Sequence, residues 1–90
     1  MHFEWDKEKA AENAQKHRVT FQEAASVFGD PLAITYSDPD HSRREDRYVT
    51  FGLSDQNRLL VVAHTFRTDR VRLISARPMT AKERRIYEEG

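Results

Sequence analysis

The first third of the chain carries two helix patterns. Asp6 can accept hydrogen bonds from the free amides of a first helical turn, and alanines are the only apolar side chains in residues 7–17 that follow it. Thr20 and Glu23 have the spacing of a capping box, and the apolar residues after them recur at helical spacing. A glycine and an Asp-Pro pair then end this pattern. We therefore predict two N-terminal helices.

The rest of the chain is dominated by strand patterns. One segment contains five consecutive apolar residues, which is typical of a central strand covered on both faces. Others alternate apolar and polar residues, as half-buried strands do. The predicted strands are residues 32–36, 47–54, 58–67 and 70–77.

The last two predicted strands form a hairpin, because Thr68-Asp69 between them suits a tight reversal. Strict alternation in the final strand assigns its side chains to two faces. One face is expected to carry Val71, Leu73 and Ser75, and the other Arg70, Arg72 and Ile74.

A second capping box, from Thr80 to Glu83, predicts a short C-terminal helix through Tyr87. The expected fold class is α+β: two N-terminal helices, an antiparallel sheet of about four strands and a short C-terminal helix. At 90 residues we expect a single domain spanning residues 1–90.

The composition narrows the classes of protein that fit. There is no cysteine, which excludes disulfides and thiolate chemistry and suits a reducing compartment. No apolar run approaches the roughly 20 residues of a membrane span, and the N-terminus lacks the pattern of a signal peptide. We therefore expect a cytoplasmic protein. With 38% hydrophobic residues in so short a chain the core is thin, so stabilisation by a partner is expected.

The formal net charge is zero, but the charge is unevenly distributed. Residues 1–66 carry eight Lys and Arg against eleven Asp and Glu, whereas residues 67–90 carry seven against four. The basic residues of the last third are almost all arginine, whose planar fork suits phosphate. The C-terminal hairpin is therefore a candidate for contact with a phosphate-rich partner.

A set of short motifs extends through nearly the whole chain. They are Phe3-Glu4-Trp5-Asp6 with Lys9 and Asn13, Lys16-His17, Phe21 with Glu23-Ala24, Phe28-x-Asp30-Pro31, Glu45-x-Arg47-Tyr48, Gly52, Leu60-Val61-Val62, Arg67, Arg72-Leu73-Ile74-Ser75-Ala76-Arg77, Thr80 to Glu83 and Tyr87. Together these motifs resemble one known family, the BrnT toxins.

The resemblance implies a RelE-like ribonuclease fold, toxicity through RNA cleavage and translation arrest, and neutralisation by a ribbon-helix-helix antitoxin of the BrnA type in a hetero-oligomer. One position departs from the family pattern: Arg18 stands where the family commonly has glycine. The turn after the first helix is expected either to lack a left-handed residue or to place strain on Arg18.

If the chain cleaves RNA through the 2′-hydroxyl of its substrate, it needs a base, an acid and cationic donors for the phosphorane, but no metal or other cofactor. The candidate catalytic residues are Arg67, Arg77, Arg72, Glu45 and His17. Along the hairpin Arg67 and Arg77 are up to roughly 25 Å apart, which argues against both contacting one phosphate. Arg67 is then expected near Arg70 or Arg72, and Arg77 near the N-terminal helix.

Other residues are candidates for holding RNA: Lys9, Lys16, Tyr48, His64 and Tyr87. The two lysines lie seven residues apart on the first helix and would share a face. The tyrosines can stack on a base or protonate a leaving oxygen, and the imidazole can exchange a proton near neutral pH. The histidine spacing predicts no metal site.

Each of these residues also has a structural interpretation. Surface arginines and lysines are often merely solvated, histidines and tyrosines often pack, and Glu45 has the alternative of pairing with an arginine. Two other classes of protein therefore stay open: a non-catalytic binding module that docks nucleic acid or an acidic protein through its basic hairpin, and a subunit that folds only in a complex.

Overall fold

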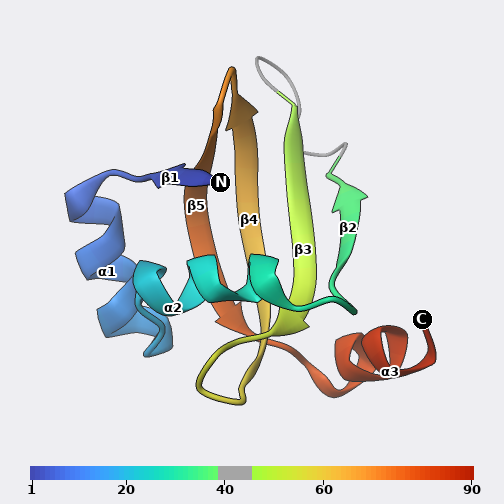
Figure 1. Cartoon of the computed structure of the whole chain (residues 1–90). Coiled ribbons are helices and arrows are strands. Elements are labelled where there is room, and N and C mark those ends of the chain that lie inside the picture. The colour runs from blue at the N-terminus through green and yellow to red at the C-terminus, as the bar shows by residue number, and fades with distance from the viewer. Residues whose placement is uncertain (39–45) are drawn as a thin grey trace.

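The computed structural model describes residues 1–38 and 46–90, which form one mixed β-sheet packed against helices (Figure 1). The sheet order within these residues is β1-β5-β4-β3-β2. The elements in chain order are β1 (His2–Glu4), α1 (Lys7–His17), α2 (Phe21–Ser26), the 3₁₀ helix η1 (Val27–Gly29), β2 (Ile34–Ser37), β3 (Arg47–Leu53), β4 (Leu59–Arg67), β5 (Arg70–Pro78) and α3 (Ala81–Glu89).

The predicted fold class is wrong. A strand that was not counted in the predicted sheet precedes the first helix, and the described sheet has five strands instead of about four. The sheet is also mixed, because β1 pairs with β5 in parallel while the other pairs are antiparallel. Three residues are too few to show alternation, so the sequence pattern does not reveal β1 as a strand.

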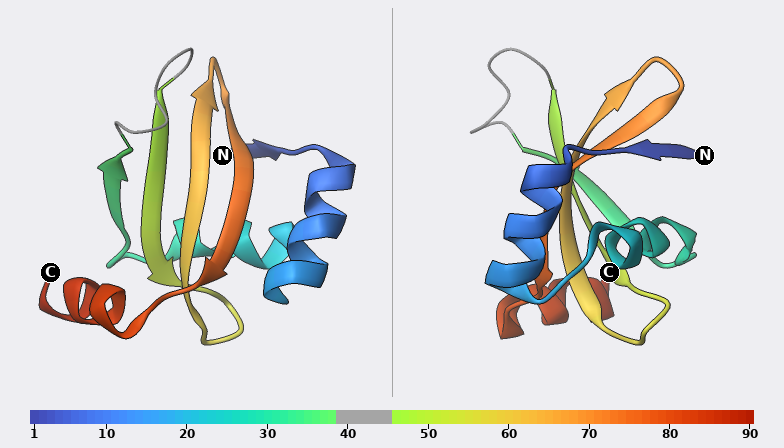
Figure 2. Two further views of the ribbon diagram at one scale, coloured as in Figure 1. Left: turned by 180° about the vertical axis from the view of Figure 1, so that it is seen from behind. Right: turned by 90° about the vertical axis from the view of Figure 1, so that its left-hand side faces the viewer.

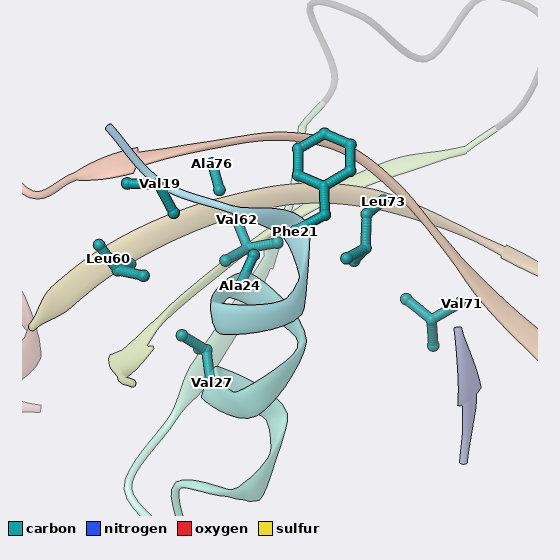
Figure 3. Close-up of a cluster of buried hydrophobic side chains, with 9 residues drawn as sticks. All are labelled: Val19, Phe21, Ala24, Val27, Leu60, Val62, Val71, Leu73 and Ala76. Atoms are coloured by element: carbon teal, nitrogen blue, oxygen red, sulfur yellow. The ribbon is translucent and has the colours of Figure 1, made fainter. Parts of the chain in front are cut away.

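The main core lies between α2 with η1 and one face of the sheet, which we call the core face (Figure 1). Figure 3 shows this cluster, in which four buried side chains from α2, η1 and the chain before α2 meet five from β4 and β5. They are Val19, Phe21, Ala24, Val27, Leu60, Val62, Val71, Leu73 and Ala76. Their burial removes apolar surface from water, which is the dominant favourable contribution to folding.

A smaller cluster lies on the opposite face of the sheet, where α3 packs near the ends of the central strands (Figure 2). It contains Phe51, Val61 and Met79, with Tyr87 of α3 packed against them. Because α3 is short, the remainder of this face is not covered by a helix in the described residues (Figure 2).

Helix α1 occupies the predicted residues and ends at a strained position. The Asp6 carboxylate caps its N-terminus by accepting from the amides of Glu8 and Lys9 at 2.8 and 3.2 Å. Arg18 adopts the left-handed conformation after its last turn, with φ 59° and ψ 32°. The backbone of Arg18 therefore has a conformation that favours glycine.

The alternation predicted for the last strand is broken by a β-bulge. Ala63 of β4 pairs with Ser75 of β5, whereas the next residue of β4, His64, pairs with Leu73. Ile74 is therefore an extra residue on β5, and a bulge of this kind shifts the side chains beyond it to the other face. Ser75 does not share a face with Leu73 as predicted, and Ala76 instead joins the core.

Only one half of the first predicted capping box is present. Thr20 accepts from the amide of Glu23 at 3.1 Å and so caps α2. The carboxylate of Glu23 is buried and accepts instead from the Ser54 hydroxyl at 2.7 Å and from Arg58. The ion pair between Glu23 and Arg58 connects α2 to the residue just before β4. The second capping box, at Thr80 and Glu83, is complete.

Candidate functional site

Five arginines project from the face of the sheet opposite α2. Directly paired residues of neighbouring strands share a face, and the register aligns Arg47 of β3, Thr65 of β4 and Arg72 of β5 in one row. Arg67 pairs with Arg70 in the next row. Beyond the bulge, Arg77 pairs with Val61, which also lies on this face. We call this surface the arginine face, and its arginines are Arg47, Arg67, Arg70, Arg72 and Arg77.

A depression of about 230 Å³ lies on the arginine face across β3, β4 and β5. Its floor is made of small and apolar side chains, and arginines stand at its two ends. We call it the sheet depression. Its lining residues are Asp38, Arg47, Val49, Val61, Ala63, Ile74, Ser75 and Arg77.

A second depression, of about 240 Å³, lies between α1 and β5, and we call it the helix depression. It shares Ile74 and Ser75 with the sheet depression, so the two adjoin at the bulge. Its other lining residues come from one side of α1: Lys9, Glu12, Asn13, Lys16 and His17. The structure thus brings three of the predicted site residues of α1 to the same surface as Arg77.

Asn13 fixes α1 beside the bulged strand. Its side-chain amide is buried, donates to the carbonyls of Val19 and Ala76 at 2.9 Å each, and accepts from the Ala76 amide at 3.0 Å. The side chain thus supplies hydrogen bonds to the edge of β5 in place of a neighbouring strand. This anchor sets the position of the lysines and of His17 relative to Ser75.

Arg77 is held by a carboxylate. Its guanidinium donates to both oxygens of Glu83, at 2.7 and 2.9 Å. The hydrogen bond from Arg77 is the main cause that lowers the pKa of Glu83 to about 2, and the same bond raises the pKa of Arg77. Glu83 also accepts from the Thr80 amide at 2.9 Å. Arg77 is thereby oriented by the first turn of α3.

The other arginines of the hairpin gather around Glu4 of β1. Arg72 donates to Glu4 at 2.7 Å, and Arg70 lies 3.6 Å from the same carboxylate. Arg67 also contributes to lowering the pKa of Glu4, although the hydrogen bond from Arg72 is the largest cause. The arginine face therefore has two groups: Arg67, Arg70 and Arg72 near Glu4, and Arg47 and Arg77 at the sheet depression. Arg67 and Arg77 are separated, as the hairpin geometry predicted.

Two of the predicted RNA-binding residues lie on the core face instead. His64 is 0% exposed, and its Nε2 atom forms a 2.8 Å hydrogen bond with the hydroxyl of Thr50. The rings of Phe28, Tyr48 and Phe66 surround the imidazole. Burial lowers the pKa of His64 to about 4. Its ring is closed to solvent, and Tyr48 stacks against it. Neither residue therefore faces the depressions on the opposite side of the sheet.

Tyr87 has a structural contact on α3. Its hydroxyl donates to Asp30 at 2.7 Å, which raises the pKa of Tyr87 to about 12. The same carboxylate oxygen accepts from the amide of Leu53 at 2.8 Å, so Tyr87 ties α3 to the end of β3. Glu45, the remaining predicted catalytic residue, lies outside the described residues.

Two residues of this surface, and one residue that supports it, were not predicted as site residues. Arg47 and Ser75 line the sheet depression, and Glu83 holds Arg77. The capping-box motif identified Glu83 but not its second role. The side of the sheet on which Ser75 and Arg77 lie depends on the bulge, which has no signature in the residues around Ile74.

Among residues 1–38 and 46–90, no three His, Asp or Glu side chains come together as a metal site would require. No helix in this part of the chain is both long enough and apolar enough to span a membrane.

Comparisons with known proteins agree with this architecture. A family model described as the ribonuclease toxin BrnT of a type II toxin–antitoxin system matches residues 5–83. The fold is similar to the 1.1 Å crystal structure of the Brucella abortus ribonuclease toxin BrnT, with a TM-score of 0.67 and 18% identity over 89% of this chain and 97% of that one. The comparison with curated proteins gave no match. The chain belongs to the BrnT family of ribonuclease toxins of type II toxin–antitoxin systems.

Proposed function

We propose that this chain is an endoribonuclease that cleaves RNA and arrests translation. The observation that carries the proposal is the meeting of the two depressions at Ile74 and Ser75. Basic side chains of α1 border this surface on one side and Arg47 and Arg77 on the other. An RNA backbone that lies across this surface would contact basic side chains on both sides.

The chemistry we propose is attack of the 2′-oxygen of RNA on the adjacent phosphorus, with departure of the 5′-oxygen. The extra negative charge on the phosphorane requires donors aimed at it. Arg47 and Arg77 stand two strands apart and four residues apart in register, which puts their Cα atoms about 16 Å from one another. Long side chains from both ends can therefore approach a phosphate placed between them.

We assign proton transfer to His17, because imidazole is the side chain most often used as a general acid or base in catalysis. It lines the helix depression together with Lys9 and Lys16. These two lysines hold the phosphates that flank the scissile one. Arg67 and Arg72, beside Glu4, contact the RNA backbone further along the hairpin.

The reaction we propose requires no protein-bound metal and no other cofactor, because the nucleophile belongs to the RNA. Cleavage by the purified chain should therefore persist in EDTA and leave 2′,3′-cyclic phosphate ends. Loss of cleavage in EDTA, with recovery when Mg²⁺ is restored, would contradict this part of the proposal.

A toxin of a type II system has an antitoxin partner. We propose that the partner here is a ribbon-helix-helix protein of the BrnA type and that the two form a hetero-oligomer. The adjacent reading frame should then encode a protein that copurifies with this chain and restores growth when both are expressed.

The decisive experiment is regulated expression of the chain alone, followed by measurement of growth and of intact messenger RNA. Arg77→Ala and the double variant Lys9→Ala with Lys16→Ala should relieve growth arrest while remaining folded. Arg85→Ala, which removes an exposed arginine of α3, is the matched control and should remain toxic. Binding of RNA without fragments, in cells and with purified protein, would instead identify a non-catalytic binding module.

A further inference from the structure

Tyr36 of β2 is an exposed aromatic side chain on the arginine face. It pairs directly with Val49 of β3, whose side chain lines the sheet depression. Paired side chains share a face, so the tyrosine ring lies on the same side of the sheet as Arg47 and Arg77. Tyr36 remains 45% exposed.

The register extends this relationship across the sheet. Tyr36, Val49, Ala63 and Ser75 occupy one row from β2 to β5. The last three of these residues form part of the floor of the sheet depression. Tyr36 therefore stands at the end of that row, roughly 14 Å from Ser75 at the usual strand spacing.

The ring of Tyr36 is supported from one side. It meets Phe51 at a centroid distance of 5.6 Å in an edge-on arrangement, and Phe51 belongs to the buried cluster beneath α3. Asp38, two residues further on, lines the depression as well. A supported ring with exposed surface beside a cationic depression resembles the platforms on which single-stranded nucleic acids stack their bases.

We infer that Tyr36 stacks on an unpaired base of the RNA whose phosphate lies in the sheet depression. The inference rests on the proposed function and adds a positioning residue to it. Stacking needs a base free of its neighbours, as in single strands and loops. Tyr36 thus favours unpaired RNA and places the scissile phosphate between Arg47 and Arg77.

Binding to a single-stranded RNA and to its non-cleavable 2′-O-methyl copy tests this role. Tyr36→Ala should weaken binding of the copy by about 5- to 150-fold, the range found when a stacking aromatic is removed. Tyr36→Phe retains the ring and should bind like the parent. Phe66→Ala is the matched control, since Phe66 is 55% exposed on the core face, and it should leave binding unchanged.

A fluorescent base gives a readout that a packing role would not affect. With 2-aminopurine moved along the RNA, one position should be quenched by the parent and by Tyr36→Phe but not by Tyr36→Ala. The inference is overturned if the parent cleaves and binds RNA while Tyr36→Ala does so equally well, if Tyr36→Phe loses as much as Tyr36→Ala, or if Phe66→Ala loses as much. A parent that neither cleaves nor binds RNA overturns the proposed function itself.

Discussion

The guanidinium of Arg77 and the carboxylate of Glu83 form two parallel hydrogen bonds, of 2.7 and 2.9 Å, between the end of β5 and the first turn of α3. Such a bidentate pair fixes the plane of the guanidinium more firmly than a single contact does. One side chain of the arginine face is therefore oriented by the same carboxylate that caps a helix.

This pair should make stability depend on acid. The pKa of Glu83 is about 2 in the folded chain, below its usual 4.5. The stabilisation is thus present above pH 4.5 and lost as the pH falls from 4.5 toward 2. Since Arg77 is 41% exposed, solvent screening limits the contribution to about 1–2 kcal/mol. Urea unfolding across this range should show a smaller loss of stability in Glu83→Gln than in the parent, and equal losses would contradict the assignment.

His64 should produce a second pH dependence, in a different range. Its pKa falls from 6.5 to about 4 on burial, so between these values the unfolded chain binds a proton that the folded chain does not. Stability should then decrease as the pH drops from 6.5 to 4, by about 3 kcal/mol in total. His64→Gln, which cannot titrate, should flatten this part of the unfolding curve. An unchanged slope would show that the ring is solvated.

Arg18 is predicted to be a site where glycine improves stability. Its φ of 59° and ψ of 32° are costly for any residue with a Cβ atom. Arg18→Gly should raise the free energy of unfolding by about 0.5–1 kcal/mol, as measured by urea denaturation. Arg18→Ala separates backbone from side chain, because it removes the charge but keeps the Cβ atom. An equal gain in both variants would argue against a backbone origin.

Gly52 should not tolerate even one methyl group. A Cβ atom there would lie 2.6 Å from Cγ1 of Val27 and 3.2 Å from Cβ of Ala33. Gly52→Ala should therefore cost about 1–3 kcal/mol through overpacking. Gly29→Ala is the control, since nothing lies within 4 Å of a Cβ atom at that position, and its effect should be small. Thermal unfolding of both variants measures the difference.

Local signals in the sequence predicted local structure well. The Asp6 cap and the Thr68-Asp69 turn lie where they were expected, because each depends on a few neighbouring residues. The fold class was wrong because the parallel pairing of β1 with β5 joins residues almost seventy positions apart. Such pairing leaves no mark on the pattern of a three-residue strand.

The candidate site was likewise predictable only in part, because its assembly depends on contacts between distant residues. The basic residues of α1 and of the hairpin were visible in the sequence, but their meeting at one surface depends on the bulge at Ile74 and on the contact of Asn13 with Ala76. His64 sits in a strand with both polar and apolar neighbours, and this local pattern does not predict whether it is buried. Its complete burial depends on the packing of Phe28 over it.

The bulge at Ile74 also gives the two strands of this hairpin different tolerance to changes in length. A strand that loses one residue normally exchanges its inner and outer side chains from that point onward. β5 carries a spare residue, so a one-residue deletion near Ile74 can be absorbed by straightening the strand. β4 pairs continuously with β3 from Leu59 to Thr65, and a deletion there would turn Val62 or its neighbours out of the protein interior. One-residue deletions should therefore be tolerated in β5 near Ile74 but not in β4.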